Sequence, residues 1–323
     1  MYTNQKPFFI RVITPLHAGT GSDIGIIDMP IQRERHTNFP KIESSGLKGS
    51  LRDYFETTPK EKDEINLVFG PDNDKNAHAA AFALTDAAVL FFPVKSAKGV
   101  YALITCPSVL KRFFEFRAIK LKEDATPVKI ENAANALKKI DEDKANPLGD
   151  GCWCTKYSPL VLGEVVVLEE FALKAKNDDG GLMSALKDYF TFLGKDKTDK
   201  IVCVSDEVFR DFVTLSTELI TRNKINAETG TVQKGALFSE EFLPPETILY
   251  SFLQTGPVNI DENNKKYDKY TEAKKNIEKM GGVEQFLDKG FPTTFQIGGD
   301  ATIGKGIVKV YWEKENKPEG KHE

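Results

Sequence analysis

The sequence predicts an α+β fold of the ferredoxin-like type. Segments typical of strands and helices follow one another between residues 6 and 173 in the order strand, helix, strand, strand, helix, strand. This is the order of a split β-α-β unit, which RNA-recognition domains also use. With 323 residues, of which 40% are hydrophobic and 28% charged, the chain has the composition of a soluble globular protein and can bury a large core.

The first strand and the first helix are expected within the first 55 residues. Residues 6–14, KPFFIRVIT, have strand composition, and Pro15 ends the strand. A helix is expected to begin near Gly46, with Ser44 or Ser45 as its N-cap. Its apolar residues recur at i, i+4, i+7 and i+8, the spacing of one helix face: Leu47, Leu51, Tyr54 and Phe55.

The middle of the chain is expected to complete this unit. Residues 81–94 and 100–106 have strand composition, and Pro107 then opens a second helix, because proline is accepted in a first helical turn. VVVLEEFAL, near residues 165–173, is expected to supply the next strand. The polar stretch from about residue 121 to 150 is expected to be an insertion that is partly helical and well solvated.

The last third contains a helix start, a hairpin and a glycine-rich end. Ser205 is expected to cap a helix whose acidic first turn suits the helix dipole. Two polar strands joined by a Glu-Thr-Gly turn predict a long hairpin over about residues 222–242, which projects because it has few core residues. Residues 267–287 alternate Lys and Glu and predict a solvated surface helix. Residues 293–312 predict a strand, a glycine-rich loop and a strand.

Composition excludes several classes of protein. Four cysteines, Cys106, Cys152, Cys154 and Cys203, lack the spacing of a zinc site, so we expect reduced thiols. No apolar run reaches the ~18 residues of a membrane-spanning helix, and MYTNQKPFF is not typical of a signal peptide. A cytoplasmic protein without a membrane partner is therefore expected.

One segment reverses the sign of the overall charge. The chain has 44 basic and 48 acidic residues, a net charge of −4. In DMPIQRERHTNFPKIESSGLKGSLR, residues 28–52, the part from Pro30 onward has five Lys or Arg and two Glu. A local excess of positive charge indicates a binding face more than net charge does. We therefore expect a basic groove on an otherwise acidic body.

Two glycine-rich loops invite nucleotide-binding interpretations that their surroundings disfavour. GDATIGK, residues 299–305, has the spacing of a phosphate-binding loop, but Gly306 replaces the Ser or Thr and a strand follows instead of a helix. Its glycines can still let backbone N–H groups approach a phosphate, or simply form a flexible loop. GTGSDIG, residues 19–25, has one residue too many for a dinucleotide fingerprint and no helix after it.

Asp28 and His17 are the candidate catalytic residues. An Asp in a loop usually makes a turn, and with an ordinary pKa near ~3.9 it is a poor general base. Near RNA phosphates, however, a carboxylate can hold a divalent cation or orient a 2′-hydroxyl for in-line attack. His17 precedes the first glycine-rich loop, and a lone His is more often structural than catalytic. Neither a Ser-His-Asp nor a Cys-His constellation is evident.

Three segments together resemble one family. DMPIQRERHTNFPKIESSGLKGSLR, RNKINAETGTVQKGALFSEEFLP and FQIGGDATIGKG lie near the start, past the middle and at the end of the chain. Their order is similar to that in the RNA-guide backbone subunits of type III-B CRISPR (Cmr) RNA-silencing complexes, which belong to the RAMP (repeat-associated mysterious protein) superfamily. The resemblance spans nearly the whole chain.

The resemblance implies a modified ferredoxin-like palm in a single domain over residues 1–323, with a finger region at about 121–150 and a thumb hairpin at about 222–242. Copies are implied to stack head-to-tail along the guide RNA together with other Cmr subunits. Each thumb would displace one nucleotide of the guide–target duplex at six-nucleotide intervals. The single-stranded target RNA would be cut there with a divalent metal, Mg²⁺ or Mn²⁺, that binds only with RNA.

The resemblance also implies the site residues. Asp28 is implied to be catalytic and to bind the metal, with His17 as a possible auxiliary residue. The helix start implies guide-backbone contacts at Ser45, Gly46, Lys48 and Gly49, where free N–H groups favour phosphate. The remaining predicted RNA contacts are Gln32, Arg33, Arg35, Arg52, Arg222, Lys224, Gly298, Gly299, Thr302, Gly304 and Lys305.

Three other functions remain open. A purely structural guide-binding subunit would not need Asp28 within its Asp-x-Pro-Ile-Gln motif. A guide-processing RAMP ribonuclease would have a His-centred site, which keeps His17 of interest, although the projecting hairpin disfavours it. A nucleotide-hydrolysing enzyme is disfavoured by Gly306.

Overall fold

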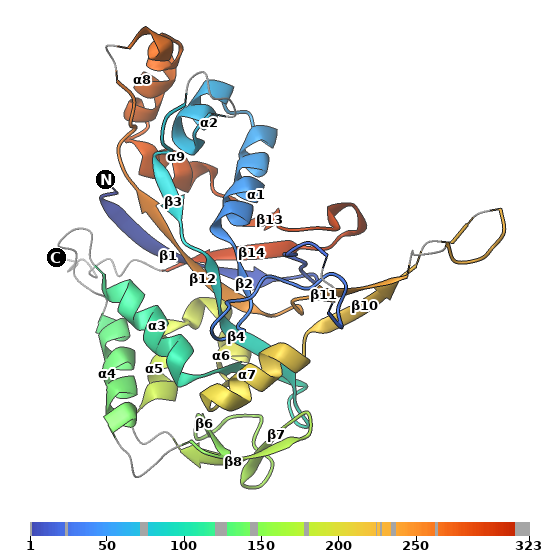
Figure 1. Cartoon of the computed structure of the whole chain (residues 1–323). Helices are drawn as coiled ribbons and strands as arrows, with labels where there is room; N and C mark the ends of the chain where they lie inside the picture. Colours follow the sequence, from blue (N-terminus) through green and yellow to red (C-terminus); the bar gives the residue numbers. More distant parts are fainter. Residues whose placement is uncertain are drawn as a thin grey trace.

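The fold is built on one large mixed sheet. The computed structural model describes residues 2–22, 25–71, 77–119, 128–142, 148–177, 181–223, 225–226, 228–233, 237–261 and 264–313. In the sheet the strands lie in the order β13-β14-β1-β12-β4-β5-β9-β6-β8-β7, with β2 paired to β4 and β3 to β12. The β5–β9 and β6–β8 pairs are parallel and the other pairs are antiparallel. A separate two-stranded sheet, β10-β11, projects from this body (Figure 1).

The strands have the following bounds: β1 Asn4–Val12, β2 Lys41–Ile42, β3 Phe82–Leu84, β4 Ala87–Lys95, β5 Tyr101–Thr105, β6 Gly151–Cys154, β7 Val165–Leu168, β8 Phe171–Asn177, β9 Ile201–Cys203, β10 Glu218–Arg222, β11 Phe238–Phe242, β12 Ile248–Thr255, β13 Thr294–Gln296 and β14 Ile307–Trp312. The α-helices are α1 Ser44–Thr57, α2 Lys62–Phe69, α3 Pro107–Ala118, α4 Val128–Glu142, α5 Leu182–Tyr189, α6 Lys195–Thr198, α7 Asp206–Leu215, α8 Thr271–Lys279 and α9 Val283–Gly290. Short 3-10 helices are η2 Thr191–Leu193, η3 Lys265–Tyr270 and η4 Ala301–Ile303.

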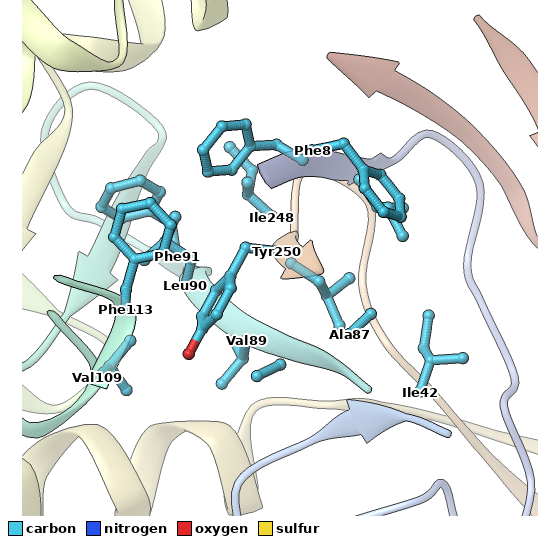
Figure 2. Close-up of a cluster of buried hydrophobic side chains, with 14 of the residues drawn as sticks. Phe8, Ile42, Ala87, Val89, Leu90, Phe91, Val109, Phe113, Ile248 and Tyr250 are labelled. Atoms are coloured by element: carbon cyan, nitrogen blue, oxygen red, sulfur yellow. The ribbon is translucent and has the colours of Figure 1, made fainter. Parts of the chain in front are cut away.

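The core forms on both faces of β1. Phe9 packs on one face against Phe113 of α3 and against Phe190. Phe8, one residue earlier, points to the opposite face and packs against Phe291 and Trp312. Figure 2 shows part of this core, with labelled side chains from β1, β2, β4, α3 and β12. Burial on both faces explains why residues 7–10 of this strand, PFFI, are all apolar instead of alternating with polar residues.

Residues 165–173 were predicted to form one strand of the ferredoxin-like unit. Both the number of strands and their position in the sheet are different. The segment forms two strands, β7 and β8, because Glu169 and Glu170 make the turn between them. The pair lies at the far edge of the sheet, whereas β12 and β14 flank β1. The last strand of the predicted ferredoxin-like unit therefore does not lie beside β1, and the predicted strand order is not formed by these segments. The coarser prediction, a mixed α and β fold around one sheet, is confirmed.

Three further predictions need correction. The predicted strand over residues 81–94 is divided into β3 and β4. Residues 267–287 contain two helices separated at Gly281 and Gly282, both with positive φ, and they bury apolar side chains instead of lying solvated on the surface. The most deeply buried of these residues are Tyr270, Ile277, Phe286 and Leu287. Within the polar 121–150 stretch, α4 packs on α5 and buries Ala133, Ala136 and Leu137. Residues 120–127 and 143–147 lie outside the described residues.

Several local predictions are confirmed. Pro107 is the first residue of α3, and the Ser205 hydroxyl accepts a hydrogen bond from Val208 N at 3.3 Å as the N-cap of α7. The hairpin forms, starting at Glu218, and β13, the glycine-rich loop and β14 follow as predicted. All four cysteines are free and buried.

Within the described residues, no helix combines the length and apolarity needed to span a membrane.

Candidate functional site

Asp28 lies in a segment that runs beside β11 at the base of the hairpin. Met29 N donates to Ser239 O at 3.0 Å, and Glu241 N donates to Met29 O at 3.0 Å. These two bonds form an isolated parallel bridge between Met29 and Glu240 of β11. The Asp28 side chain is exposed. The sequence motif around Asp28 and the hairpin, 211 residues apart, thus meet at one place.

Ser239 orients the Asp28 carboxylate. Asp28 Oδ2 accepts hydrogen bonds from Ser239 N at 2.7 Å and from Ser239 Oγ at 2.8 Å. The Ser239 hydroxyl in turn accepts from Asp28 N at 3.0 Å. The Ser239 backbone N–H and then its hydroxyl lower the pKa of Asp28 below its usual value. The group is therefore a fixed anion at neutral pH, suited to orienting a hydroxyl and a poor general base.

Arg33 is partly buried and engaged within the protein, so its predicted RNA contact stays a prediction and would compete with internal partners. Its guanidinium pairs with Glu241 Oε1 at 2.5 Å and also donates to Asn38 O and Val213 O. Glu241 is only 2% exposed, so this is a buried ion pair. Glu241 Oε2 also accepts from Ile31 N at 3.0 Å. Arg33 consequently fixes the path of the segment after Asp28.

Gln32 and Arg52 are also engaged within the protein. The Gln32 amide donates to Gly19 O at 3.1 Å and accepts from Glu43 N at 2.7 Å, so it ties two loops together. The Arg52 guanidinium donates to Gly70 O at 2.7 Å and to Asn66 Oδ1 at 2.6 Å, which joins α1 to α2. By contrast, Arg35 is exposed and remains a predicted RNA contact.

His17 is enclosed in a charged cluster beside Asp28. It is 5% exposed, and its Nδ1 lies 2.7 Å from Glu241 O. Its Nε2 lies 3.7 Å from Glu240 Oε1, and a Cβ at Gly19 would be 2.3 Å from the same nitrogen. The His17 ring therefore has no room for a substrate in this conformation, which disfavours a His-centred ribonuclease site.

Arg222 bridges two carboxylates in the same cluster. Its Nε lies 2.8 Å from Glu240 Oε2, and its guanidinium also bonds Asp300. Burial, together with the nearby Asp300 charge, raises the pKa of Glu240. The predicted RNA contact at Arg222 thus competes with two internal partners. Lys224, also predicted to bind RNA, lies outside the described residues.

Sequence reasoning missed Ser239, Glu240 and Glu241. They follow one another in FSEEF, the second strand of the hairpin, where polar residues were expected to be solvent-exposed. Both Glu side chains are instead buried, at 4% and 2% exposure. One signal of this burial was available in the sequence: the two adjacent glutamates directly precede the apolar Phe242 and Leu243. A carboxylate that is buried beside such residues needs charged or N–H partners.

The start of α1 is open. Gly46 and Gly49 are exposed, and a Cβ at either position would meet nothing within 4 Å. A glycine inside a helix lowers helix stability by about 1 kcal/mol relative to alanine. Internal packing does not require Gly46 or Gly49. The predicted serine caps are wrong: Glu43 occupies the N-cap position without a capping hydrogen bond. Ser44 N donates instead to Asp86 Oδ1 at 2.9 Å.

Lys48 is turned away from this open face. Its Nζ donates to Phe82 O at 3.3 Å and lies 4.5 Å from the centre of the Phe82 ring. Desolvation, and the neighbouring Arg52, lower the pKa of Lys48. Its predicted guide contact requires the ammonium to leave this half-buried position.

The C-terminal glycine-rich loop is closely packed against the His17 segment. The N–H groups of Gly299 and Gly306 donate to His17 O and Pro15 O, both at 2.9 Å. Those of Gly304 and Lys305 donate to Ala301 O and Asp300 O. These four N–H groups are bonded within the protein, which disfavours a phosphate cradle at this loop, and the RNA contacts predicted at Gly298, Gly299, Gly304 and Lys305 stay predictions. Thr302 is exposed and stays a predicted contact.

A resident metal does not fit the residues present. Within the described ranges there is no group of three or more His, Cys, Asp or Glu side chains placed to hold an ion. Asp28 contributes one carboxylate, and Ser239 occupies one of its oxygens. A divalent cation can bind here only if RNA supplies most of its ligands.

Comparison with known proteins decides the family. A family model described as the RAMP superfamily matches residues 9–309. The chain is also 37% identical, over 320 residues and 97% of each chain, to the CRISPR system Cmr endoribonuclease Cmr4 of Pyrococcus furiosus. The chain belongs to the RAMP superfamily, within its Cmr4 family. The resemblance drawn from the three sequence segments is thereby confirmed.

Solved structures of RAMP proteins share the fold. The crystal structure of oligomeric Cmr4 from Pyrococcus furiosus matches with a TM-score of 0.65 and 30% identity, covering 97% of this chain and 100% of that one. A cryo-EM structure of the type III-B Cmr-beta complex bound to cognate target RNA matches with a TM-score of 0.71 at 22% identity, over 96% of this chain and 98% of that one, and shows likeness of fold alone.

Proposed function

We propose that this chain is the guide-RNA-binding backbone subunit of a type III-B Cmr complex and the endoribonuclease that cuts guide-paired target RNA. The observation that carries the catalytic assignment is the exposed Asp28 carboxylate, fixed at one oxygen by Ser239. It lies at the base of a projecting hairpin, where a displaced nucleotide would expose its phosphate. The endoribonuclease name of the Pyrococcus relative supports the reaction type.

Asp28 acts by orientation in this proposal. Cleavage by the substrate's own 2′-hydroxyl requires that oxygen, the phosphorus and the leaving 5′-oxygen to lie in line. A fixed carboxylate can accept the hydroxyl hydrogen bond and hold this geometry. No hydrogen bond to Asp28 Oδ1 is found within the described part of the chain, so this oxygen can receive the hydroxyl. A divalent cation, Mg²⁺ or Mn²⁺, is included only as one held jointly with RNA, and no step is assigned to it.

The guide RNA is proposed to lie across the start of α1. The exposed Ser45, Gly46 and Gly49 let an RNA backbone approach the helix, and the first-turn N–H groups favour phosphate. The main sheet is the proposed palm, the region around α4 the finger, and β10-β11 the thumb (Figure 1). Copies of the chain stack head-to-tail with other Cmr subunits, in the cytoplasm, and cut at six-nucleotide steps.

The test is single-turnover cleavage of an end-labelled target by complexes reconstituted with wild-type, Asp28→Ala or Asp28→Asn subunits. We expect both variants to cut at least about 100-fold more slowly at every step of the ladder while target affinity is retained, because a group used only in the transition state changes the rate and not the binding. Asp53→Ala, an exposed aspartate of α1, is the matched control and is expected to cut normally.

Two results would overturn parts of the proposal. Wild-type cutting by the Asp28→Ala complex would leave a structural guide-binding subunit that does not cut at this residue. Loss of target binding by both variants would mean that Asp28 supports the fold or the groove instead of the reaction.

A further inference from the structure

We propose that Ser239 and Glu241 are positioning residues for Asp28, with Ser239 fixing its carboxylate and Glu241 fixing the segment that carries it. The inference rests on the proposed catalytic role of Asp28. Ser239 and Glu241 are two residues apart on β11, so both side chains project from the same face of the strand. That face lies against the segment from Asp28 to Arg33.

Ser239 restrains Asp28 from two directions. Its hydroxyl donates to Oδ2 and accepts from Asp28 N, so one hydroxyl bonds both ends of the residue. Its backbone N–H donates to the same Oδ2 at 2.7 Å. Rotation of the Asp28 carboxylate would break at least one of these bonds. The second oxygen is therefore kept in one orientation before substrate arrives.

Glu241 fixes the backbone that follows Asp28. Its Oε2 accepts from Ile31 N at 3.0 Å, and its Oε1 accepts from Arg33 Nη2 at 2.5 Å and from Thr217 Oγ1 at 2.8 Å. Its backbone N–H also donates to Met29 O at 3.0 Å. Residues 29, 31 and 33 are thus all bonded to one residue of the hairpin, and the Asp28 segment cannot move relative to β11 without breaking them.

Stability alone does not explain the Ser239 bonds. Asp28 is exposed and Ser239 is only partly buried, and hydrogen bonds that compete with water add little net stability. The three bonds between Asp28 and Ser239 therefore fix the orientation of the Asp28 side chain more than they stabilise the fold. Catalytic groups need that geometry, because a misplacement of about 1 Å can cost about a hundredfold in rate.

The test separates rate from binding in the reconstituted complex. Ser239→Ala keeps the backbone N–H bond but loses both hydroxyl bonds. We expect its single-turnover rate at saturating target to fall about tenfold, with the target Kd unchanged within about twofold. Ser239→Thr keeps the hydroxyl and is expected to recover most of the rate. Ser184→Ala is the matched control, since Ser184 is an exposed serine of α5 that lies outside the hairpin.

Glu241 needs a variant that separates positioning from folding. Glu241→Gln removes the carboxylate partner of the partly buried Arg33 and is expected to lower both Tm and rate. The double variant Arg33→Met with Glu241→Leu removes both charges, so Tm is expected to recover. The Ile31 N–H acceptor is still missing in that variant, so the rate is expected to stay at least about tenfold low.

Specific outcomes overturn the inference. A Ser239→Ala complex that cuts at the wild-type rate, or one that loses target binding in proportion to its rate, shows that Ser239 does not position the carboxylate. Recovery of rate together with Tm in the double variant reduces Glu241 to a folding role. Wild-type cutting by Asp28→Ala would instead remove the proposed function itself, so the two failures are distinguishable.

Discussion

In the loop around residues 297–306, a Cβ added at Gly298 or Gly306 would lie 2.2 Å from His17 O or 2.0 Å from Ile297 O. At Gly46 and Gly49 of α1, an added Cβ would meet nothing within 4 Å. Both segments are glycine-containing, and the sequence predicted RNA or phosphate contact at both. The difference shows that one set of glycines serves internal packing and the other leaves a surface open. The surroundings of each glycine therefore decide whether the missing side chain serves internal packing or leaves a surface open.

Gly306→Ala gives the largest expected effect. Its φ of 73° is disfavoured for a residue with a side chain, and the new Cβ would collide with the Ile297 carbonyl. We expect a loss of about 3 kcal/mol or more in unfolding free energy, measured by urea denaturation. Gly304→Ala is the control. It has a φ of 78° but meets nothing within 4 Å, so only about 1 to 2 kcal/mol of backbone strain is expected. Equal losses in both variants would contradict the packing explanation.

Gly49→Ala is expected to move stability and RNA affinity in opposite directions. An alanine in the middle of α1 meets no obstacle and should stabilise the protein by roughly 0.5 to 1 kcal/mol. If RNA lies against this face, the added methyl group pushes it away, and guide affinity should fall about tenfold, or about 1.4 kcal/mol. Thermal unfolding and filter binding measure the two effects. Unchanged affinity in a stabilised variant would show that the open face is not the guide site.

Arg35 and Lys48 extend the comparison to charged residues. Arg35 is exposed, whereas the Lys48 ammonium is half-buried against Phe82. Arg35→Met should lower the slope of log affinity against log salt by about one unit if Arg35 contacts one phosphate. Lys48→Met keeps the packed stem, and its slope should change less. A larger change at Lys48 would mean that RNA draws its side chain out of the Phe82 contact.

The sequence predicted the local elements better than their arrangement. The first strand, predicted over residues 6–14 and observed over 4–12, the helix from Pro107 and the Ser205 cap follow from composition and capping rules. The position of β12 beside β1 does not, because strand pairing between residues 4–12 and 248–255 depends on packing across the whole chain. For the same reason the sequence indicated Asp28 through its motif but not Ser239, whose role appears only when the hairpin meets the motif.

Charged residues show a similar limit. A basic run predicts a binding face only if its side chains lack internal partners. Arg33 and Arg52 turned out to be engaged by Glu241 and by Asn66, whereas Arg35 is exposed. Sequence spacing cannot distinguish these cases, since the partners are 208 residues away for Arg33 and 14 for Arg52.

Asp86 caps the start of α1 from another loop, so the helix start can be capped and still open. Substitution of Asp86 gives the smallest expected effect on stability. Asp86 Oδ1 accepts from Ser44 N, and Oδ2 accepts from Lys41 Nζ at 2.9 Å. Burial alone would raise the pKa of Asp86, but the Lys41 and Ser44 hydrogen bonds outweigh it and lower the pKa below its usual value. A cap supplied from another loop leaves Ser45 and Gly46 exposed to a ligand.

The lowered pKa fixes the sign of the pH dependence. A carboxyl group whose pKa is lower in the folded state contributes stability above its unfolded pKa, near ~3.9, and loses it as the pH falls through the folded value. Asp86→Asn keeps an oxygen for Ser44 N but loses the ion pair with Lys41. Because Asp86 is partly exposed and screened, we expect a loss of only about 0.5 to 1 kcal/mol at pH 7. Urea unfolding at pH 7 and near pH 3 measures it, and the difference between variant and wild type should shrink at the lower pH. A difference that persists in acid would show that the amide disturbs the cap itself, and the open helix start would then depend on shape more than on charge.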